Sequence, residues 1–174
     1  MQNRAVFLDR DGVINAGIIR DGKPYPPDGL EDFQLLSGVK DAVIVLHEAG
    51  FKLIVATNQP DVRTGKQTKS VVEAMHQMLV RDLPLSDIRI CYHINEDACA
   101  CRKPKPGMLF DAAKQWNIDL SASYMVGDRW RDIEAGQAAG CRTVFIDYGY
   151  SEKQPDSPDF VVSSLAEAVP FILQ

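Results

Sequence analysis

Ala5-Val6-Phe7-Leu8-Asp9-Arg10-Asp11-Gly12 places two aspartates, one residue apart, where a short apolar run ends. The run Ala5 to Leu8 has the length and composition of a buried parallel strand, and Gly12 permits a sharp turn directly after it. In an open α/β sheet, ligands bind beyond the carboxyl ends of the strands, where Asp9 and Asp11 would lie. Two crowded carboxylates repel each other, so this pair predicts a neighbouring cation or a shared proton.

The composition is that of an ordinary globular protein. The chain has 174 residues, of which 45% are hydrophobic and 25% charged, with a net charge of -5. We expect one domain over residues 1–174. The acidic net charge argues against nucleic-acid binding, and no run approaches the ~20 apolar residues of a membrane span. The first apolar run is too short for a signal-peptide core. We therefore expect a cytoplasmic monomer.

Apolar runs alternate with helical patterns along the chain. This alternation predicts a Rossmann-like, doubly wound parallel sheet with helices on both faces. Residues 16–33 are rich in glycine, proline and aspartate and are expected to be a loop. The expected strands are 5–8, 52–56, 88–92, 124–126, 143–146 and, more weakly, 160–162. The expected helices are 39–50, one that begins at Ser70, 108–116, 133–139 and one that follows Ser164. Gly50 and Gly140 are expected to end the first and fourth of these helices, and Glu73 is expected to form a capping box with Ser70. Pro170 is expected to disturb the last helix.

Three of these strands end in polar residues that a simple turn does not require. They are Asp9-x-Asp11, Thr57-Asn58 and Asp128. Asp9-x-Asp11 taken alone is equally compatible with turn or cap residues, but three matching ends favour a shared site. Like charges at ~4 Å and an effective dielectric of ~20 cost about 4 kcal/mol for each pair. A hard cation with oxygen ligands, Mg²⁺, would relieve that repulsion.

A fixed positive charge is expected beside the carboxylates, in Arg102-Lys103-Pro104-Lys105-Pro106. The two prolines restrict this segment, so its basic side chains are presented rigidly. Lys103 is the candidate, whereas Lys105 fits solvated surface charge better. Carboxylates, a hydroxyl, an amide, Mg²⁺ and a lysine together are typical of a phosphoryl-transfer site.

A second metal site is predicted by Cys91-x-His93 and Cys99-x-Cys101. Three thiolates and one imidazole form the Cys₃His set of a closed, structural Zn²⁺ site. The alternative is four incidental buried residues, which two such closely spaced pairs disfavour. Zinc here would hold the loop that carries Lys103. Cys141 lies outside the cluster and is expected to be an ordinary buried thiol.

The motifs together resemble the haloacid dehalogenase (HAD) superfamily, and the resemblance covers essentially the whole chain. More narrowly, it is to the branch containing heptose-1,7-bisphosphate 7-phosphatases and histidinol-phosphate phosphatases, which has no large cap domain. The motifs that carry it, in chain order, are Asp9-Arg10-Asp11-Gly12-Val13-Ile14-Asn15, Thr57-Asn58-Gln59, the Cys-x-His…Cys-x-Cys loop, Cys101-Arg102-Lys103-Pro104-Lys105-Pro106-Gly107-Met108 and Val126-Gly127-Asp128.

The resemblance implies a Mg²⁺-dependent phosphomonoesterase with an aspartyl-phosphate intermediate. Asp9 would be the nucleophile, and Asp11 the general acid and then the general base. Mg²⁺ would be held by Asp9, the backbone carbonyl of Asp11 and Asp128. Asp132 would orient these groups from outside.

The resemblance also implies how the substrate is held. Thr57, Asn58 and Lys103 would contact the transferring phosphoryl group. Arg102 and Arg129 match positions near the rest of the substrate. Specificity would come from three segments, namely 16–33, the residues after Gln59, and the zinc loop.

The residues after Gln59 depart from the pattern of the heptose phosphatases. That pattern has a Ser-Gly pair and an Arg-Gly ending, where this chain has Pro60-Asp61-Val62-Arg63-Thr64-Gly65. An inward-facing Asp61 would repel a second phosphate but would suit the amine of histidinol phosphate. A sugar phosphate such as heptose 1,7-bisphosphate is favoured, and histidinol phosphate is the alternative.

Two readings from other classes also remain. A phosphorylatable receiver-type switch likewise uses strand-end aspartates, Mg²⁺, a threonine and a lysine, but needs neither Asp11 as proton donor nor a zinc loop. A zinc-stabilised binding module would leave the aspartates without a catalytic role. A long-lived phosphoenzyme would favour the first, and activity that survives Asp9→Asn would favour the second.

Overall fold

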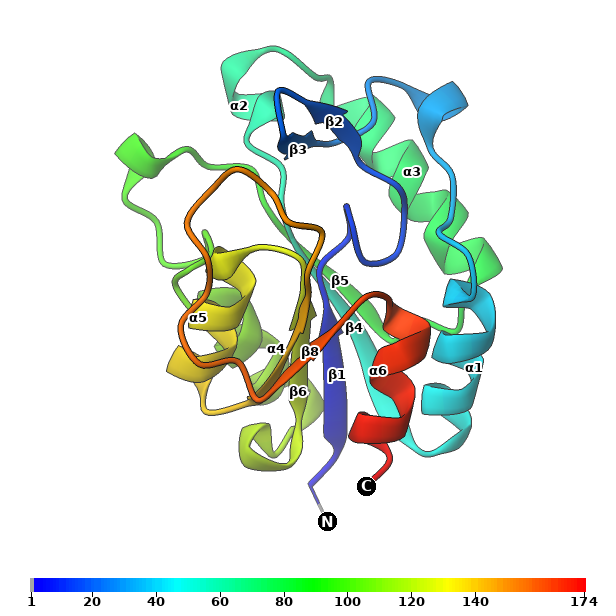
Figure 1. Ribbon diagram of the computed structural model, residues 1–174. Helices are drawn as coiled ribbons and strands as arrows, with labels where there is room; N and C mark the ends of the chain where they lie inside the picture. The colour runs from blue at the N-terminus through cyan, green and yellow to red at the C-terminus, as the bar shows by residue number, and fades with distance from the viewer. Residues whose placement is uncertain (1) are drawn as a thin grey trace.

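The computed structural model describes residues 2–174 and is built on a six-stranded parallel sheet (Figure 1). The predicted doubly wound topology is confirmed, because the chain extends the sheet from β1 first to one side and then to the other. The strands, in order across the sheet, are β5 (Asp87–Cys91), β4 (Phe51–Asn58), β1 (Arg4–Leu8), β6 (Tyr124–Gly127), β7 (Arg142–Ile146) and β8 (Phe160–Val162).

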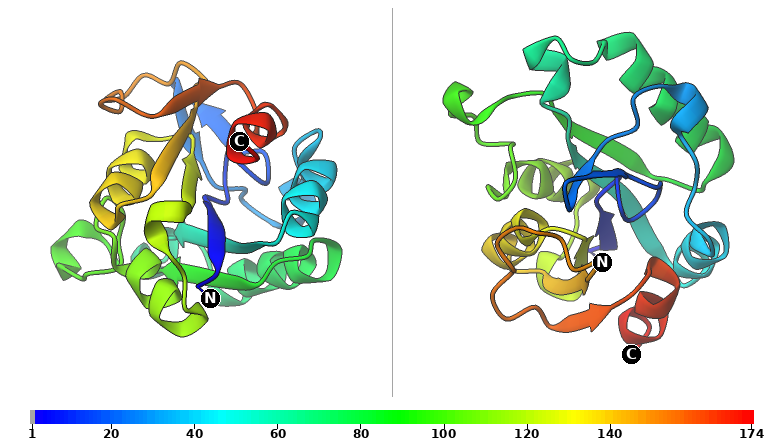
Figure 2. Two further views of the ribbon diagram at one scale, coloured as in Figure 1. Left: turned by 90° about the horizontal axis from the view of Figure 1, so that it is seen from below. Right: turned by 45° about the horizontal axis from the view of Figure 1, so that its top comes forward.

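Helices cover both faces of this sheet (Figure 2). Alternate side chains of β1 enter different cores, since Val6 and Leu8 face one layer and Ala5 and Phe7 the other. The first core is closed by α1 (Val39–Glu48), α3 (Lys69–Asp82) and α6 (Leu165–Ile172). The second is closed by α4 (Gly107–Trp116) and α5 (Trp130–Ala139). Burial on both faces explains why the strands are continuously apolar in sequence.

The segment expected as a loop, residues 16–33, contains a β-hairpin. Its strands are β2 (Ile18–Arg20) and β3 (Lys23–Tyr25), which pair antiparallel. The turn between them is Asp21-Gly22, with φ of 51° and 70°. Asp-Gly with positive φ at both positions is the favoured two-residue hairpin turn, a signal that the prolines nearby obscured. A short 3₁₀ helix follows at Leu30–Asp32.

Other differences concern the ends of elements. The helix expected from Ser70 begins at Lys69, and its N-cap is Thr68, whose hydroxyl accepts from the Val71 N–H; the capping box expected with Glu73 is wrong. The helix expected after Ser164 is α6, which has Ser164 as its N-cap and continues past Pro170 to Ile172. The short helix α2 (Asp61–Thr64) and the 3₁₀ turns Asn95–Asp97 and Leu120–Ala122 were not predicted. Within residues 2–174, no helix is both long and apolar enough to cross a membrane.

Candidate active site

Three aspartates and a lysine meet at the carboxyl edge of the sheet, where β1 and β6 lie side by side. Asp9 follows β1, Asp128 follows β6, and Asp132 is in the first turn of α5; one oxygen of each carboxylate lies within 4.8 Å of the others. Lys103 Nζ is 2.8 Å from Asp9 Oδ1 and 2.6 Å from Asp132 Oδ1. A Cβ on Gly12 would lie 2.0 Å from Asp128 Oδ2, so glycine is required for this close approach. Two of the three predicted strand ends, Asp9 and Asp128, therefore lie together, whereas Thr57 does not line the cavity described below.

Burial makes this cluster electrostatically demanding. Desolvation and the charge of Asp132 raise the pKa of Asp9 to about 6, although Lys103 opposes the shift. Desolvation and the charge of Asp9 raise the pKa of Asp128 well above its usual value. Burial disfavours the charged form of Lys103, yet Asp132 and Asp9 together raise its pKa. One lysine thus faces three buried carboxylates, and a further cation would balance them.

The oxygen atoms left free by the protein fit Mg²⁺. Asp128 Oδ1 is buried and has no hydrogen-bond partner among the described residues. Both oxygens of Asp132 are engaged, because Oδ1 contacts Lys103 Nζ and Oδ2 accepts from the Arg129 N–H at 3.0 Å. Asp9 and Asp128 thus offer the hard oxygen ligands that Mg²⁺ prefers, while Asp132 contacts Lys103 and so can orient it.

The carboxylate of Asp11 lies apart from this cluster and is surrounded by donors. Oδ1 accepts from Arg10 Nη2 and Asn15 Nδ2, both at 2.9 Å, and Oδ2 accepts from Gln59 Nε2 at 2.9 Å. Gln59 also donates to Thr57 Oγ1 at 2.9 Å, which ties the end of β4 to the same network. Asp11 lines the cavity described below, so it can exchange a proton with a ligand there.

The loop that carries Lys103 is fixed through Asn58. The Asn58 side chain donates to the Lys103 carbonyl and accepts from the Lys103 N–H, each at 3.1 Å. The Lys103–Pro104 peptide bond is cis, and Lys103 Nζ also donates to the Ala56 carbonyl at 2.6 Å. Both polar ends of the Asn58 side chain are thus occupied by backbone, which places Asn58 as a support for Lys103.

A cavity of about 240 Å³ opens above these groups. Its floor includes Asp9, Asp11 and Lys103, and residues 23–26 of the β2–β3 hairpin form part of its wall. Asp61, at the start of α2, is on the wall as well. Four further basic side chains line it, namely Lys23, Arg102, Arg129 and Arg131. The cavity therefore combines the acidic side chains that could hold a metal with several basic ones.

The three arginines differ in how they are held. Arg129 donates to Glu152 at 2.9 Å, and Arg102 donates to the Asn95 side chain at 2.9 Å. Arg131 forms no ion pair within 4.0 Å among the described residues and lies over the Trp130 ring, 4.4 Å from its centroid. Burial, and then the charges of Arg102 and Arg129, lower the pKa of Arg131. Arg131 was absent from the sequence prediction, although its place between Arg129 and Asp132 was a usable signal.

The segment 147–152, which follows β7, packs over the same edge of the sheet. Tyr148 donates to the Gly12 carbonyl at 2.9 Å, and Tyr150 donates to Asp128 Oδ2 at 2.8 Å. The two tyrosine rings stack with centroids 5.5 Å apart. The Ser151 N–H bonds to the Gly22 carbonyl of the hairpin at 2.9 Å. This segment therefore connects Asp128 to the hairpin that forms part of the cavity wall.

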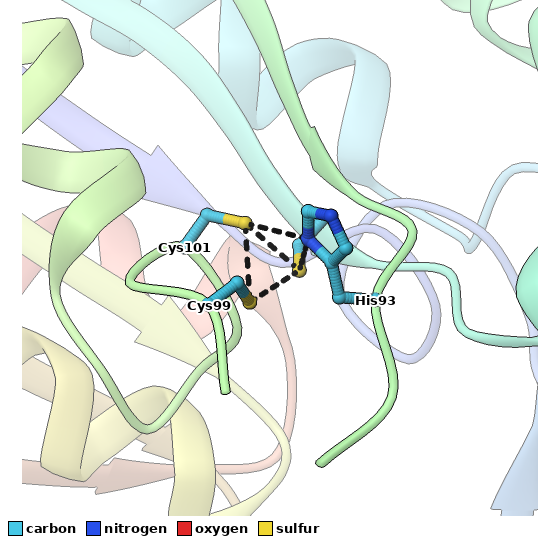
Figure 3. Close-up of side chains that lie close together, drawn as sticks. His93, Cys99 and Cys101 are labelled. Atoms are coloured by element: carbon cyan, nitrogen blue, oxygen red, sulfur yellow. Dashed lines mark hydrogen bonds between the residues drawn. The ribbon is translucent and has the colours of Figure 1, made fainter. Parts of the chain in front are cut away.

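The predicted zinc ligands gather in one place, as the three side chains labelled in Figure 3 illustrate. Cys101 Sγ lies 3.1 Å from Cys91 Sγ, 3.5 Å from Cys99 Sγ and 3.3 Å from His93 Nδ1. These separations are close to those between ligands at ~2.0–2.3 Å around one tetrahedral Zn²⁺. Burial by itself would raise the pKa of the Cys99 thiol. Hydrogen bonds from the Arg102 N–H and from the neighbouring thiols outweigh burial and lower this pKa to about 7. The four residues fit zinc.

Cys141 lies away from this cluster, buried beside α4 and α5 in the second core, as predicted. The zinc ligands begin at the end of β5 and stop one residue before Arg102. A metal bound there would therefore fix the loop that delivers Arg102 and Lys103 to the cavity.

Comparison with known proteins agrees with this arrangement. The HAD-hydrolase-like family matches residues 100–168. The D-glycero-β-D-manno-heptose-1,7-bisphosphate 7-phosphatase of Escherichia coli K12 is 36% identical over 94% of this chain and 90% of its own length. The enzyme of that name from Haemophilus ducreyi is 36% identical over 99% and 100%. A crystal structure of D,D-heptose 1,7-bisphosphate phosphatase from B. bronchiseptica, complexed with magnesium and phosphate, has a TM-score of 0.79 at 29% identity and covers 98% of each chain.

The chain belongs to the HAD-like hydrolases and is a phosphoric monoester hydrolase of that family. Within it, the chain groups with the phosphatases that are named for heptose 1,7-bisphosphate. The resemblance drawn from the strand-end and zinc motifs is thereby confirmed.

Proposed function

We propose that this chain is a Mg²⁺-dependent phosphatase that removes one phosphate from a sugar bisphosphate, with D-glycero-β-D-manno-heptose 1,7-bisphosphate as the favoured substrate. The observation that carries the proposal is the set of basic side chains in the cavity. Lys23, Arg102, Arg129 and Arg131 line it in addition to Lys103, which lies against Asp9. A substrate with two phosphates can place one beside Asp9 and Lys103 and the other against the remaining basic side chains. The relatives named above carry the same substrate in their names.

Asp9 and Asp11 divide the chemistry between them in this proposal. An oxygen of Asp9 attacks phosphorus, the bond from phosphorus to the sugar oxygen breaks, and Asp11 gives its proton to that oxygen. Asp11 then takes a proton from water as the water oxygen attacks phosphorus, which frees Asp9 and releases inorganic phosphate. Mg²⁺, held by Asp9, Asp128 and the Asp11 carbonyl, would neutralise charge on the phosphoryl oxygens.

The remaining residues position the phosphoryl group. Lys103 is held rigidly by Asp132 and by the Asn58 amide, so its charge is already in place before the substrate arrives. Thr57 lies at the end of β4 and is linked to Asp11 through Gln59. We assign Thr57 and Lys103 to the phosphoryl group undergoing transfer, with Arg102, Arg129 and Arg131 at the second phosphate.

Histidinol phosphate is the second candidate, and Asp61 is the observation that favours it. Asp61 lines the cavity and would attract an amine. Five basic side chains line the same cavity, however, namely Lys23, Arg102, Lys103, Arg129 and Arg131, and they would repel the amine of histidinol phosphate. The bisphosphate therefore fits the charges better.

Phosphate release from three compounds tests the assignment. They are heptose 1,7-bisphosphate, heptose 7-phosphate and histidinol phosphate, each tried with the native protein and with Asp9→Asn. We expect kcat/KM for the bisphosphate to exceed that for either monophosphate by about tenfold or more, since each charge-assisted contact contributes roughly 1.5–3 kcal/mol. Asp9→Asn is expected to be inactive. An equal or higher kcat/KM for histidinol phosphate would overturn the substrate assignment.

A matched pair of variants tests the basic part of the cavity. Arg131 and Lys153 both lie against the Trp130 ring, but only Arg131 lines the cavity. Arg131→Gln is expected to raise KM for the bisphosphate about tenfold and to leave the monophosphate unchanged. Lys153→Gln is expected to change neither. Equal effects of the two variants would contradict the role of Arg131.

We further propose that residues 1–174 form one domain that acts as a monomer in the cytoplasm. One sheet uses strands from both ends of the chain, and the four cysteines are unpaired, as is usual in a reducing compartment. Light scattering on the purified protein tests the monomer, and a dimer at micromolar concentration would contradict it.

A further inference from the structure

Arg10, between the two catalytic aspartates, is the largest fully buried side chain. Its Nε and Nη2 both donate to Asp11, at 3.1 Å and 2.9 Å from Oδ1. The opposite edge of the guanidinium faces α3, where Nη1 lies 3.1 Å from His76 Nε2. The ring of Phe33 lies 5.7 Å from the guanidinium carbon. Arg10 is thus held on two edges, by Asp11 and by His76.

The contact between Arg10 and His76 fixes the form of the imidazole. A guanidinium is always charged and can only donate, so His76 Nε2 must accept and the ring must be neutral, with its proton on Nδ1. His76 is 6% exposed, and Nδ1 has no hydrogen-bond partner among the described residues. A buried, unpaired N–H is costly. Leucine or methionine would fill the space without that cost, so a histidine is explained here by its acceptor for Arg10.

We propose that His76 is a positioning residue for the phosphatase reaction, which holds the Arg10 guanidinium so that its other edge keeps the Asp11 carboxylate where proton transfer takes place. The proposal rests on the proposed function only for the role of Asp11. His76 itself touches neither the cavity nor the metal-binding aspartates in any contact the structure records.

Loss of the His76 acceptor is expected to slow only the step in which Asp11 donates a proton to the leaving group. Without an acceptor at Nε2, the Nη1 side of Arg10 would be buried unpaired, and the guanidinium would turn to seek another partner. Asp11 would then lose its fixed orientation. Asp9 and Lys103 are held by contacts that do not involve His76, and Arg102 and Arg129 are held by Asn95 and Glu152. Substrate binding and attack by Asp9 would therefore be preserved.

Two substitutions separate the acceptor from the bulk of the side chain. In His76→Gln, the amide oxygen reaches about as far as Nε2 and can accept from Arg10. In His76→Asn, the side chain is also polar, but it is shorter and its amide oxygen does not reach Arg10 Nη1. Gln77→Asn, at the neighbouring exposed position of α3, provides the matched control. Thermal unfolding shows that each variant is folded before its kinetics are measured.

The experiment compares the reaction rates of two substrates that differ in their leaving group. p-Nitrophenolate leaves without needing a proton, whereas a sugar alkoxide needs one. Single-turnover rates of leaving-group release isolate the first chemical step. We expect His76→Asn to slow release of the sugar at least tenfold and release of p-nitrophenol less than threefold, with KM for both within twofold of the native values. His76→Gln is expected to recover at least half of the loss on a logarithmic scale.

Equal slowing of both leaving groups, or no slowing with either, would overturn the role of His76. So would a glutamine variant as slow as the asparagine variant with the sugar phosphate. If His76→Asn does not fold, His76→Leu, which fills the space without an acceptor, takes its place under the same criteria, with His76→Gln and Gln77→Asn compared as before. Absence of phosphatase activity in the native protein would instead contradict the proposed function itself, so the two failures are distinguishable.

Discussion

The hydroxyl of Tyr150 donates a hydrogen bond of 2.8 Å to Asp128 Oδ2, while the other oxygen of that carboxylate is buried without a partner. The two oxygens of Asp128 are therefore not equivalent. Tyr150 holds Oδ2 and so leaves Oδ1 as the free oxygen of a carboxylate that lies beside Asp9 and Asp132. Residues that orient a metal-binding carboxylate in this way are a determinant of metal affinity.

Tyr150→Phe is accordingly expected to weaken Mg²⁺ binding about tenfold, because partners of metal ligands typically contribute 10–100-fold. Isothermal titration of the substrate-free protein measures this directly. Tyr124→Phe is the control, since Tyr124 lies in β6 and its hydroxyl accepts from Arg142, which does not line the cavity. A Tyr150→Phe protein with native Mg²⁺ affinity would show that the hydrogen bond does not orient Asp128.

Proton binding at Asp9 is expected to compete with Mg²⁺. Burial and Asp132 raise the pKa of Asp9 to about 6 in the metal-free protein, so the carboxylate is ionised above that pH and protonated below it. Apparent Mg²⁺ affinity should then fall as the pH drops below about 6, by up to tenfold for each unit from Asp9 alone, and the raised pKa of Asp128 adds to this loss. Titration at pH 7.5, 6.5, 5.5 and 5.0 measures the slope. An affinity that does not change down to pH 5 would contradict the raised pKa.

The sequence predicted the centre of this site well because its residues come from regular elements. Asp9, Thr57 and Asp128 follow apolar runs, and parallel strands bring their carboxyl ends to one edge whatever the loop lengths. Lys103 was found for a different reason, since two prolines and a neighbouring zinc motif marked its loop as rigid. These features depend on local patterns, which one sequence displays.

The surroundings of the site were missed because they depend on contacts between distant segments. Tyr150 reaches Asp128, and His76 reaches Arg10 from a helix whose periodicity indicates only which face is buried. Arg131 and the β2–β3 hairpin did have local signals. Arg131 follows the Asp128 motif closely, and Asp21-Gly22 is a hairpin turn. Neither was recognised, because the surrounding prolines and charges suggested surface loop.

Zinc is expected to stabilise the loop from Cys91 to Lys103. Cys101→Ser removes the thiol at the centre of the three shortest contacts in the cluster. The variant should bind less than one zinc per chain, unfold at a lower temperature, and show a higher KM with a smaller change in kcat, because Arg102 and Lys103 lose their support. Elemental analysis, thermal unfolding and steady-state kinetics measure these three effects.

Cys141→Ala provides the control for that experiment, because Cys141 is buried outside the cluster. It is expected to keep one zinc per chain, with a stability loss from the smaller side chain alone. A Cys101→Ser protein that retained full zinc and native KM would contradict the assignment of the cluster.

The buried imidazole of His76 is expected to make stability depend on pH. Burial, and then the charge of Arg10, lower the pKa of His76 from 6.5 to about 4 in the folded protein. Between these values the unfolded chain binds a proton that the folded chain refuses, so the free energy of unfolding falls as the pH falls from about 6.5 to 4. A shift of this size corresponds to about 3 kcal/mol, all of it available above pH 7 and lost near pH 4.

Urea unfolding of the native protein and of His76→Gln at pH 7.5, 6.0, 5.0 and 4.0 isolates this contribution. Acid also protonates the zinc ligands and the buried aspartates, but it does so in both proteins, and the difference between them cancels those effects. We expect the unfolding free energy of the native protein, relative to the glutamine variant, to decrease by up to about 3 kcal/mol across this range. A difference that stays constant would mean that His76 is not held neutral against Arg10, and the positioning role inferred for it would lose its structural basis.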